Sequence, residues 1–563
     1  MISINKCFNF NKSLFFIFSM SVLSHSIVSQ GYPPENWFHL DGSTSEYNGM
    51  NIKSVYQNLL NGKKGEVVVV AVLDSGIDTE HEDLKDVIWV NADEIPGNQL
   101  DDDGNGYVDD IHGWNFIGSK DGQNITKETL EVTRLYGKMR SKYEGVDVAK
   151  LSKKEKKEYE QYLSYKRVVE KKRSSAQKKV DEIQERASWI IGLFEAAQKT
   201  VGDQKVDHDL AEVLIKNENE PVSMAGEVLK SILEQDLEEI SLSELMEAIR
   251  VDFESMIEHY SEPLNYTYNP DFNSRAIIGD NYNDPNDRNY GNPDVGGGFS
   301  FHGTHVAGII GAARGNEIGV DGIANKVRIM SLRVVPDGDE HDKDVANAIR
   351  YAVDNGAMVV NMSFGKGQSW DKKAVDEAVK YAMKNDVLLV HAAGNDGSEN
   401  DGKNNYPNPS FEKSGLFGKK KAKNWLEVGA SSYRKGQNMI AGFSNYGKTQ
   451  VDIFAPGVAI YSTAPNNGYA FADGTSMASP VVAGTAALLR SYFPSLTACQ
   501  VKEVLLESSS PIQGKVLKPG TYERVLGKDL SVSGGMLDAY AAVKLASETK
   551  GKKKIKKKHQ NRS

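Results

Sequence analysis

The chain has 563 residues, of which 39% are apolar and 26% are charged, and this length is enough for a large core and two or three domains. The formal net charge is −10, but eight basic residues lie in the tail from Lys550 to Ser563 and two more lie at Lys6 and Lys12, so that the body between them carries −20. Such an acidic body argues against nucleic acid as a partner and suits the binding of cations. The basic tail is expected to be disordered and solvated, with contact to an anionic surface as the alternative.

The first 29 residues have the order of a secretory signal peptide. Lys6 and Lys12 precede the apolar run Leu14–Phe18, and small residues follow. A membrane anchor is the alternative, but the run is short and interrupted by serines, so we expect no membrane span. The sequence therefore predicts export to the extracellular space, the periplasm or the cell surface.

Cysteine usage limits how an exported chain is stabilised. One of the two cysteines lies inside the predicted signal, and Cys499 is the other. The mature chain would then contain no internal disulfide, and bound calcium is a candidate source of its stability.

A β-branched run over residues 65–73 predicts a buried parallel strand that ends at Asp74. Functional sites in open α/β sheets form at the carboxyl ends of strands. An aspartate there is also often a simple helix cap, so this signal is weak by itself.

The next segment, residues 101–109, is rich in aspartate and has glycine at its turn. Its alternate positions match the first half of a calcium loop, although His112 stands where a glutamate is expected. A solvated acidic turn is the alternative. The candidate ligands are Asp101, Asp103, Asn105, Tyr107 and Asp109.

Residues 119–262 are dense in lysine and glutamate and predict an inserted all-α module. Apolar positions recur at steps of seven or of three and four, which is typical of a long helix with a coiled-coil seam. Shorter amphipathic helices follow, one of them opened by a capping box at Ser241 and Glu244. The seam positions are Tyr162, Val169, Ala176, Val180, Ile183, Ala187, Ile190, Phe194 and Ala197.

Strands and helices then alternate, which indicates an α/β fold with a mostly parallel sheet covered by helices on both faces. The predicted strands are residues 328–335, 357–362, 387–392 and 425–430, and the predicted helices are 344–355 and 371–385. The expected organisation is a signal at 1–29, a catalytic domain in two parts at 30–118 and 263–545, the insertion at 119–262 and the tail at 546–563.

Two helix starts carry candidate chemistry. The segment His302–Gly308 begins a helix of small residues, and its two histidines, three apart, lack the spacing and the glutamate of a zinc helix, which leaves a general base as the other interpretation. Ser476 begins another helix, where the dipole and free amides favour negative charge, although an N-capping serine is the common case. A serine, a histidine and a strand-end aspartate supply the nucleophile, base and orienting carboxylate of acyl transfer.

Four stretches in this order resemble the subtilisin-like serine proteases: Val72–Ile77, His302–Gly308, Ala392–Asn395 and Gly474–Pro480. The resemblance covers about residues 50–118 and 270–545. It implies that Ser476 is the nucleophile, His302 the base, Asp74 the orienting carboxylate and Asn395 a donor to the oxyanion, together with the Ser476 amide.

The resemblance also implies substrate and metal sites. Ser363, Phe364 and Gly365 resemble the segment that pairs with extended substrate and walls the pocket for the residue before the cleaved bond, with Gly394 also among the substrate-binding residues; Phe364 suggests an apolar lining. A second loop resembles the family's high-affinity calcium loop, an ordinary turn being the alternative. Its implied ligands are Asp83, Arg314, Asn316, Ile318 and Val320.

The chain is thus predicted to be an exported, calcium-stabilised serine endopeptidase that hydrolyses polypeptides through an acyl-enzyme. The alternative is a binding protein that keeps the fold without the catalysis. The insertion, which lengthens the connection from Asp74 to His302, is expected to gate or dock large substrates, to aid folding or to act as a spacer. About 45 residues precede Asp74 after the signal, too few for a folded propeptide in addition to the domain's first elements.

Overall fold

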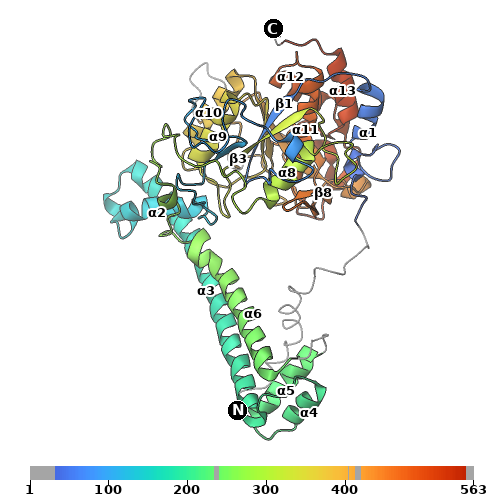
Figure 1. Cartoon of the computed structure of the whole chain (residues 1–563). Helices are drawn as coiled ribbons and strands as arrows, with labels where there is room; N and C mark the ends of the chain where they lie inside the picture. Colours follow the sequence, from blue (N-terminus) through green and yellow to red (C-terminus); the bar gives the residue numbers. More distant parts are fainter. Residues whose placement is uncertain (1–31, 234–239, 403–404, 413–419, 553–563) are drawn as a thin grey trace. The chain divides into compact units, whose positions relative to one another are not determined.

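A computed structural model describes residues 32–233, 240–402, 405–412 and 420–552. The predicted signal and most of the predicted basic tail lie outside these residues. Contacts divide the chain into two compact units (Figure 1). Residues 32–132 and 273 onward form the sheet unit, and residues 133–272 form the helical unit.

The sheet unit is built on nine strands in the order β10-β13-β7-β6-β5-β4-β1-β3-β2. Every neighbouring pair is parallel except β10 and β13, which confirms the predicted α/β fold. The strands are β1 (Val68–Asp74), β2 (Gly113–Asn115), β3 (Val327–Arg333), β4 (Val359–Met362), β5 (Leu388–Ala392), β6 (Trp425–Ser431), β7 (Ile453–Pro456), β10 (Ser510–Pro511) and β13 (Gly535–Met536).

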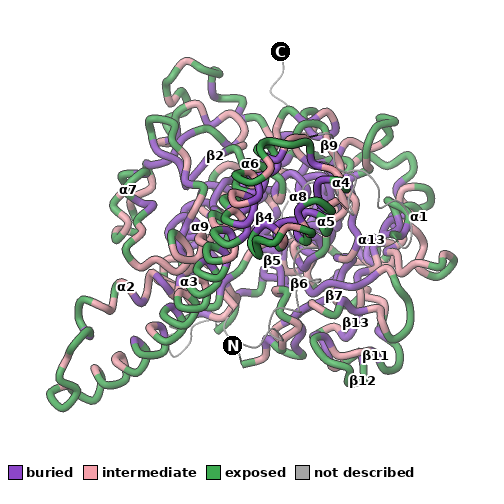
Figure 2. The backbone as a smooth tube through the Cα atoms, turned by 90° about the horizontal axis from the view of Figure 1, so that it is seen from below, coloured by how far each residue is buried: buried purple, intermediate pink, exposed green. Residues whose placement is uncertain are grey.

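Alternate residues of β1 enter two different cores, as the period of a strand requires. Val70 and Val72 belong to one core, which also contains apolar residues of α8 (Phe301–Gly311) and α11 (Thr475–Tyr492). Ala71 and Leu73 belong to the other, with α9 (Asp342–Asp354) and α10 (Lys372–Lys384). Figure 2 shows buried residues gathered along β4, β5 and α8. Helices therefore cover both faces of the sheet, as predicted.

The remaining elements of the sheet unit are short. Two antiparallel hairpins pair β8 with β9 and β11 with β12. Their bounds, with those of the other helices, are β8 (Ile460–Ala464), β9 (Gly468–Ala472), β11 (Lys515–Leu517), β12 (Arg524–Leu526), α1 (Ile52–Ser54), α7 (Arg275–Ile278), α12 (Ala498–Glu507) and α13 (Ala539–Glu548).

The segment before the first strand belongs to the core of this unit. Trp37 is fully buried, and its indole nitrogen donates to the Ala459 carbonyl at 2.8 Å. Met50 is also buried, and its carbonyl accepts from the Ala539 amide at 3.0 Å. Residues far apart in the chain therefore contact each other in the sheet unit.

The helical unit contains α3, a helix of 49 residues, packed against α6 and α5. Eight of the nine predicted seam residues are buried along α3, and Ala176 is half-buried. A capping box of Ser152 and Glu155 opens α3, and the predicted box of Ser241 and Glu244 opens α6. The helices are α2 (Glu131–Tyr143), α3 (Lys153–Val201), α4 (His208–Ile215), α5 (Glu220–Leu233) and α6 (Leu242–Glu262). Among the described residues, no helix is both long and apolar enough to cross a membrane.

Candidate active site

Three neighbouring strands of the sheet deliver candidate residues to one edge. Asp74 ends β1, Ser363 follows β4 and Asn395 follows β5. Because these strands are parallel, their carboxyl ends meet at the same edge. The helices that begin with the other candidates, α8 and α11, pack against each other and against these strands.

Asp74 and His302 form a close pair. The carboxylate of Asp74 is 2% exposed, and its Oδ1 accepts from His302 Nδ1 at 2.7 Å and from the Ser75 amide at 2.8 Å. A Cβ on Gly303 would stand 2.2 Å from the Gly76 carbonyl oxygen, so only glycine allows α8 to approach the end of β1 this closely. The arrangement fixes the ring of His302 so that Nδ1 carries the shared proton and Nε2 is left for another partner.

The two histidines of α8 have different surroundings. Burial lowers the pKa of His302, but the charge and hydrogen bond of Asp74 outweigh it, so the pKa is raised above 6.5. Burial lowers the pKa of His305 to about 4, and its Nε2 contacts the Ala470 carbonyl at 3.0 Å. His302 is thus the member suited to exchange protons near neutral pH.

Ser476 is the second residue of α11 and stands among the free amides of the helix start. Its hydroxyl donates to the Ser363 carbonyl at 3.0 Å, while the Ser363 hydroxyl donates to the Ser476 carbonyl at 2.8 Å. Within the described ranges, no hydrogen bond joins the Ser476 hydroxyl to His302. Catalytic hydrogen bonds are often long or poorly aligned before substrate binds.

Asn395 lies beside the start of α11. Its Oδ1 accepts from the amide and the hydroxyl of Thr475, both at 2.9 Å, which leaves its Nδ2 as a donor. A Cβ on Gly474 would stand 3.4 Å from Asn395 Nδ2 and 3.5 Å from the Ser476 amide nitrogen. Because Gly474 has no side chain, Asn395 Nδ2 and the Ser476 amide both border an open space, as the binding of an oxyanion requires.

Two residues that support this site were missed from the sequence. Asn361 donates to the Ser363 hydroxyl at 2.9 Å and accepts from the Ser479 hydroxyl at 2.7 Å, and both Asn361 and Ser479 are fully buried. The network joins the end of β4 to the first turns of α11. The available signal was a polar residue inside an otherwise apolar predicted strand.

The predicted calcium site that resembles the family's high-affinity loop lies around Asp83, which is fully buried. Its Oδ1 accepts from Asn316 Nδ2 at 2.7 Å, and its Oδ2 accepts from the Val320 amide at 2.9 Å. Burial raises the pKa of Asp83. Of the remaining candidates, Ile318 donates its amide to Asn316 Oδ1 at 3.3 Å, and the side chain of Arg314 turns to Gly322 and Asp321.

The predicted site in the acidic loop keeps two of the expected ligands, Asp101 and Asp103, and adds Glu94. Ligand atoms of Glu94, Asp101 and Asp103 lie within 4.8 Å of one another, a spacing that could hold a metal ion. Glu94 was missed because it precedes the loop, whereas the pattern looked for a glutamate after it. Asn105 stays in the loop and donates to Asp103 Oδ2 at 3.0 Å.

The side chains of the last two predicted ligands in the acidic loop, Asp109 and Tyr107, make other contacts. The Asp109 carboxylate accepts from the amides of Gly97 and Gln99 at 2.8 and 2.9 Å. The ring of Tyr107 is buried, with its centroid 5.1 Å from that of Trp114, so that only its carbonyl is available as a ligand.

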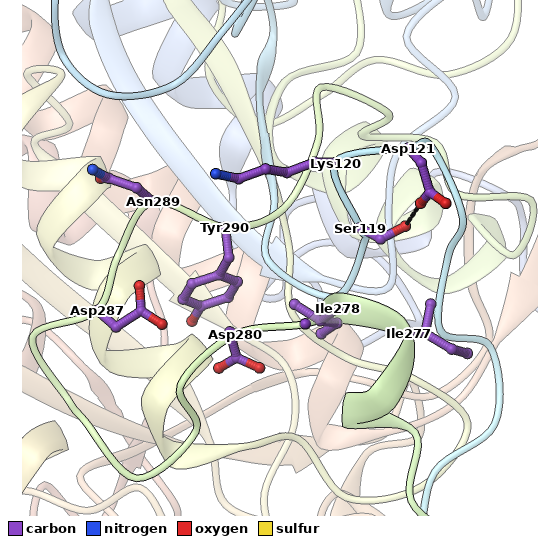
Figure 3. Close-up of a pocket in the computed structure, with 10 residues that line it drawn as sticks. Ser119, Lys120, Asp121, Ile277, Ile278, Asp280, Asp287, Asn289 and Tyr290 are labelled. Atoms are coloured by element: carbon purple, nitrogen blue, oxygen red, sulfur yellow. Dashed lines mark hydrogen bonds between the residues drawn. The ribbon is translucent and has the colours of Figure 1, made fainter.

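A separate pocket of about 470 Å³ contains none of the candidate catalytic residues. Figure 3 shows its mixed lining of charged, polar and apolar side chains. The lining residues are Ser119, Lys120, Asp121, Ile277, Ile278, Gly279, Asp280, Asp287, Asn289 and Tyr290.

Comparison with known proteins concerns the family of the chain. The model of the subtilase family matches residues 65–538. The chain is 37% identical over 264 residues to the thermophilic serine proteinase of Bacillus sp. (strain AK1), which covers 46% of this chain and 56% of that protein. It is 39% identical over 212 residues to subtilisin DY of Bacillus licheniformis, which covers 37% of this chain and 70% of that protein. Among solved structures, the prenylagaramide maturation protease PagA shares 30% identity and a TM-score of 0.34 over 44% of this chain and 83% of its own.

Proposed function

Because the chain belongs to the subtilase family, we propose that it is a serine endopeptidase that works through Asp74, His302 and Ser476. The observation that carries the proposal is the 2.7 Å hydrogen bond between His302 Nδ1 and Asp74 Oδ1. It lies at the sheet edge where α11 presents Ser476. The first relative named above is a serine proteinase, and the chain matches 56% of its length.

The proposed reaction begins when the Ser476 hydroxyl turns from the Ser363 carbonyl toward His302 Nε2. His302 takes the hydroxyl proton as Ser476 Oγ bonds to the substrate carbonyl carbon, and Asp74 stabilises the charged ring. The carbonyl oxygen becomes negative next to Asn395 Nδ2 and the Ser476 amide. His302 then gives the proton to the leaving amine, and water releases the acyl group by the same steps.

Substrate is proposed to bind as an extended strand along Ser363–Gly365. The next residue, Lys366, exchanges both backbone hydrogen bonds with Tyr406, at 2.9 and 2.8 Å. An extended peptide adds to such a segment through its own backbone groups. Gly394, whose amide donates to the Thr475 hydroxyl at 3.1 Å, would wall the other side.

Calcium is proposed to occupy two places in the sheet unit. At Asp83, turning over the Asn316 amide brings an oxygen to the carboxylate, and oxygen is the ligand that calcium prefers. The acidic cluster that includes Glu94 supplies the second set of oxygen ligands.

We also propose that the chain is exported, since calcium is abundant outside cells and the first 29 residues have the order of a signal peptide.

The test of the main proposal is labelling by a serine-directed fluorophosphonate together with hydrolysis of a fluorogenic peptide. Ser476→Ala should abolish labelling and lower kcat by several orders of magnitude, as removal of the nucleophile does in subtilisin itself. It removes one hydroxyl and little packing, so the melting temperature should change little.

The matched control is Ser547→Ala, which removes an exposed hydroxyl from α13 and should leave both readouts unchanged. Full hydrolysis by Ser476→Ala would rule out the assignment of the nucleophile. A folded wild-type protein that is neither labelled nor active would favour the alternative, a binding protein without catalysis.

A further inference from the structure

We propose that the pocket for the residue before the cleaved bond selects lysine or arginine. The inference deepens the proposed function and rests on it, because it takes Ser363–Gly365 and Gly394 as the walls of that pocket. It is carried by two side chains from outside these walls, Asn405 and Glu427.

Asn405 links the two walls. A Cβ on Gly365 would stand 2.8 Å from Asn405 Oδ1, and Asn405 Nδ2 donates to the Ala393 carbonyl at 3.2 Å. The side chain of Asn405 therefore lies between the substrate-pairing segment and the turn that leads to Asn395. It is half-buried, and its Oδ1 has acceptor capacity for a positively charged donor.

A buried carboxylate lies directly behind this amide. Glu427 is 4% exposed, and its Oε1 accepts from Asn405 Nδ2 at 3.4 Å. Its Oε2 accepts from the indole of Trp425 at 2.8 Å. Glu427 therefore places negative charge against Asn405, the side chain that links the two predicted walls.

The histidine that is hydrogen-bonded to Glu427 does not neutralise the negative charge of this carboxylate. His391 Nδ1 donates to both oxygens of Glu427 at 3.1 Å. His391 Nε2 is buried and has no hydrogen-bond partner among the described residues. A proton on Nε2 would be a buried donor without an acceptor, which is costly, so we assign the neutral tautomer with its proton on Nδ1. The pair of Glu427 and His391 then keeps a net charge of −1.

The walls suit the rest of a basic side chain. Phe364 packs against the apolar core and supplies an apolar surface, and its ring centroid lies 6.4 Å from that of His391. A second carboxylate lies near the other wall, because Asp396 Oδ2 is 3.8 Å from where a Cβ on Gly394 would stand. Lysine and arginine bury their methylene stems along apolar surface and keep the charged head on polar groups, which is the combination that this pocket offers.

The experiment compares kcat/KM for a set of fluorogenic peptides that differ only in the residue before the cleaved bond. Lysine and arginine peptides should exceed leucine and phenylalanine peptides by about tenfold, the order expected for one screened charge several ångströms away, and glutamate should be the poorest. Hydrolysis of apolar peptides without preference for basic ones overturns the inference but leaves the peptidase. Absence of all hydrolysis overturns both.

Two variants test the acidic groups individually. Glu427→Gln keeps the shape and removes the charge, so the ratio of lysine to phenylalanine hydrolysis should fall about tenfold. Asp396→Asn changes an exposed residue and should lower the same ratio by a smaller factor. Active-site titration with the fluorophosphonate corrects each rate for the folded fraction.

The matched control is Asp386→Asn, which removes the carboxylate that pairs with buried Arg490 at 2.8 Å. It costs stability as Glu427→Gln does, but it should leave the lysine to phenylalanine ratio unchanged. An unchanged ratio in both Glu427→Gln and Asp396→Asn would overturn the inference, whatever the wild-type preference.

Discussion

His302 and His305 lie one helical turn apart, yet their surroundings shift the pKa values of the two rings in opposite directions. The pKa of His302 is raised above 6.5 because Asp74 outweighs burial, and that of His305 is lowered to about 4 by burial. A general base must be unprotonated, so kcat/KM should fall as the pH drops through the raised pKa of His302. The measurement is kcat/KM against pH between 5 and 9, with an acid limb expected above pH 6.5.

The second histidine gives the control for this prediction. His305→Gln keeps a donor for the Ala470 carbonyl, and since His305 does not titrate in this range the acid limb should stay where it is. An acid limb centred below pH 6.5, or one that moves in His305→Gln, would contradict the role of His302.

Two loops of the sheet unit are proposed to hold calcium, and they differ in burial. Asp83 is fully buried, whereas Asp103 in the acidic loop is exposed, so the site at Asp83 should bind calcium more tightly. Bound calcium should stabilise the fold by about 2.7 kcal/mol at a hundredfold excess over the dissociation constant. The melting temperature should therefore rise with added calcium, and Asp83→Asn should remove more of that rise than Glu94→Gln.

Asp529→Asn, which removes an exposed carboxylate paired with Lys448, serves as the control and should keep the full rise. Magnesium should replace calcium poorly, because it demands a tighter octahedral shell. A melting temperature that is the same with calcium and with chelator would contradict both sites.

The two ends of the helical unit lie next to each other. Within it, the Thr133 hydroxyl donates to the Thr267 carbonyl at 2.8 Å, and a Cβ on Gly137 would stand 3.2 Å from the Pro270 carbonyl oxygen. A short Gly/Ser linker in place of residues 133–272 thus adds little closure entropy. If the unit gates or docks large substrates, the shortened enzyme should cleave small peptides at least as well, while its activity on protein substrates changes.

The comparison of small-peptide and protein hydrolysis separates the three roles considered for the unit. A product that is insoluble, or inactive on small peptides as well, would point to an aid in folding. Unchanged activity on both kinds of substrate would leave the unit a spacer.

At the scale of the whole molecule, the strands and helices that could be predicted are those that a local residue pattern marks in the sequence. The central strands are mostly apolar runs of four to seven residues, and β1 and β3 to β6 were predicted within a few residues of their bounds. The outer strands β10 and β13 span two residues each, too few for any periodicity to show. The long helix of the insertion was evident because its apolar seam repeats over many turns.

What the sequence could not supply are contacts between distant residues. Trp37 donates a hydrogen bond to the Ala459 carbonyl, and Glu427 accepts one from His391 on the neighbouring strand. Glu94 meets Asp101 only when the intervening loop folds back. In each case the residue looks ordinary in its own segment, because its partner is set by the fold and not by spacing along the chain.

The long helix of the insertion also bears on self-digestion. A peptidase at high concentration meets its own copies, and one that favours lysine and arginine would find many such residues in α3. An extended substrate segment is required for strand pairing, and a residue in a helix cannot adopt it without local unfolding. The capping box at Ser152 and the seam against α6 restrain that unfolding. The basic composition of α3 is therefore compatible with a long-lived enzyme as long as the helix stays wound.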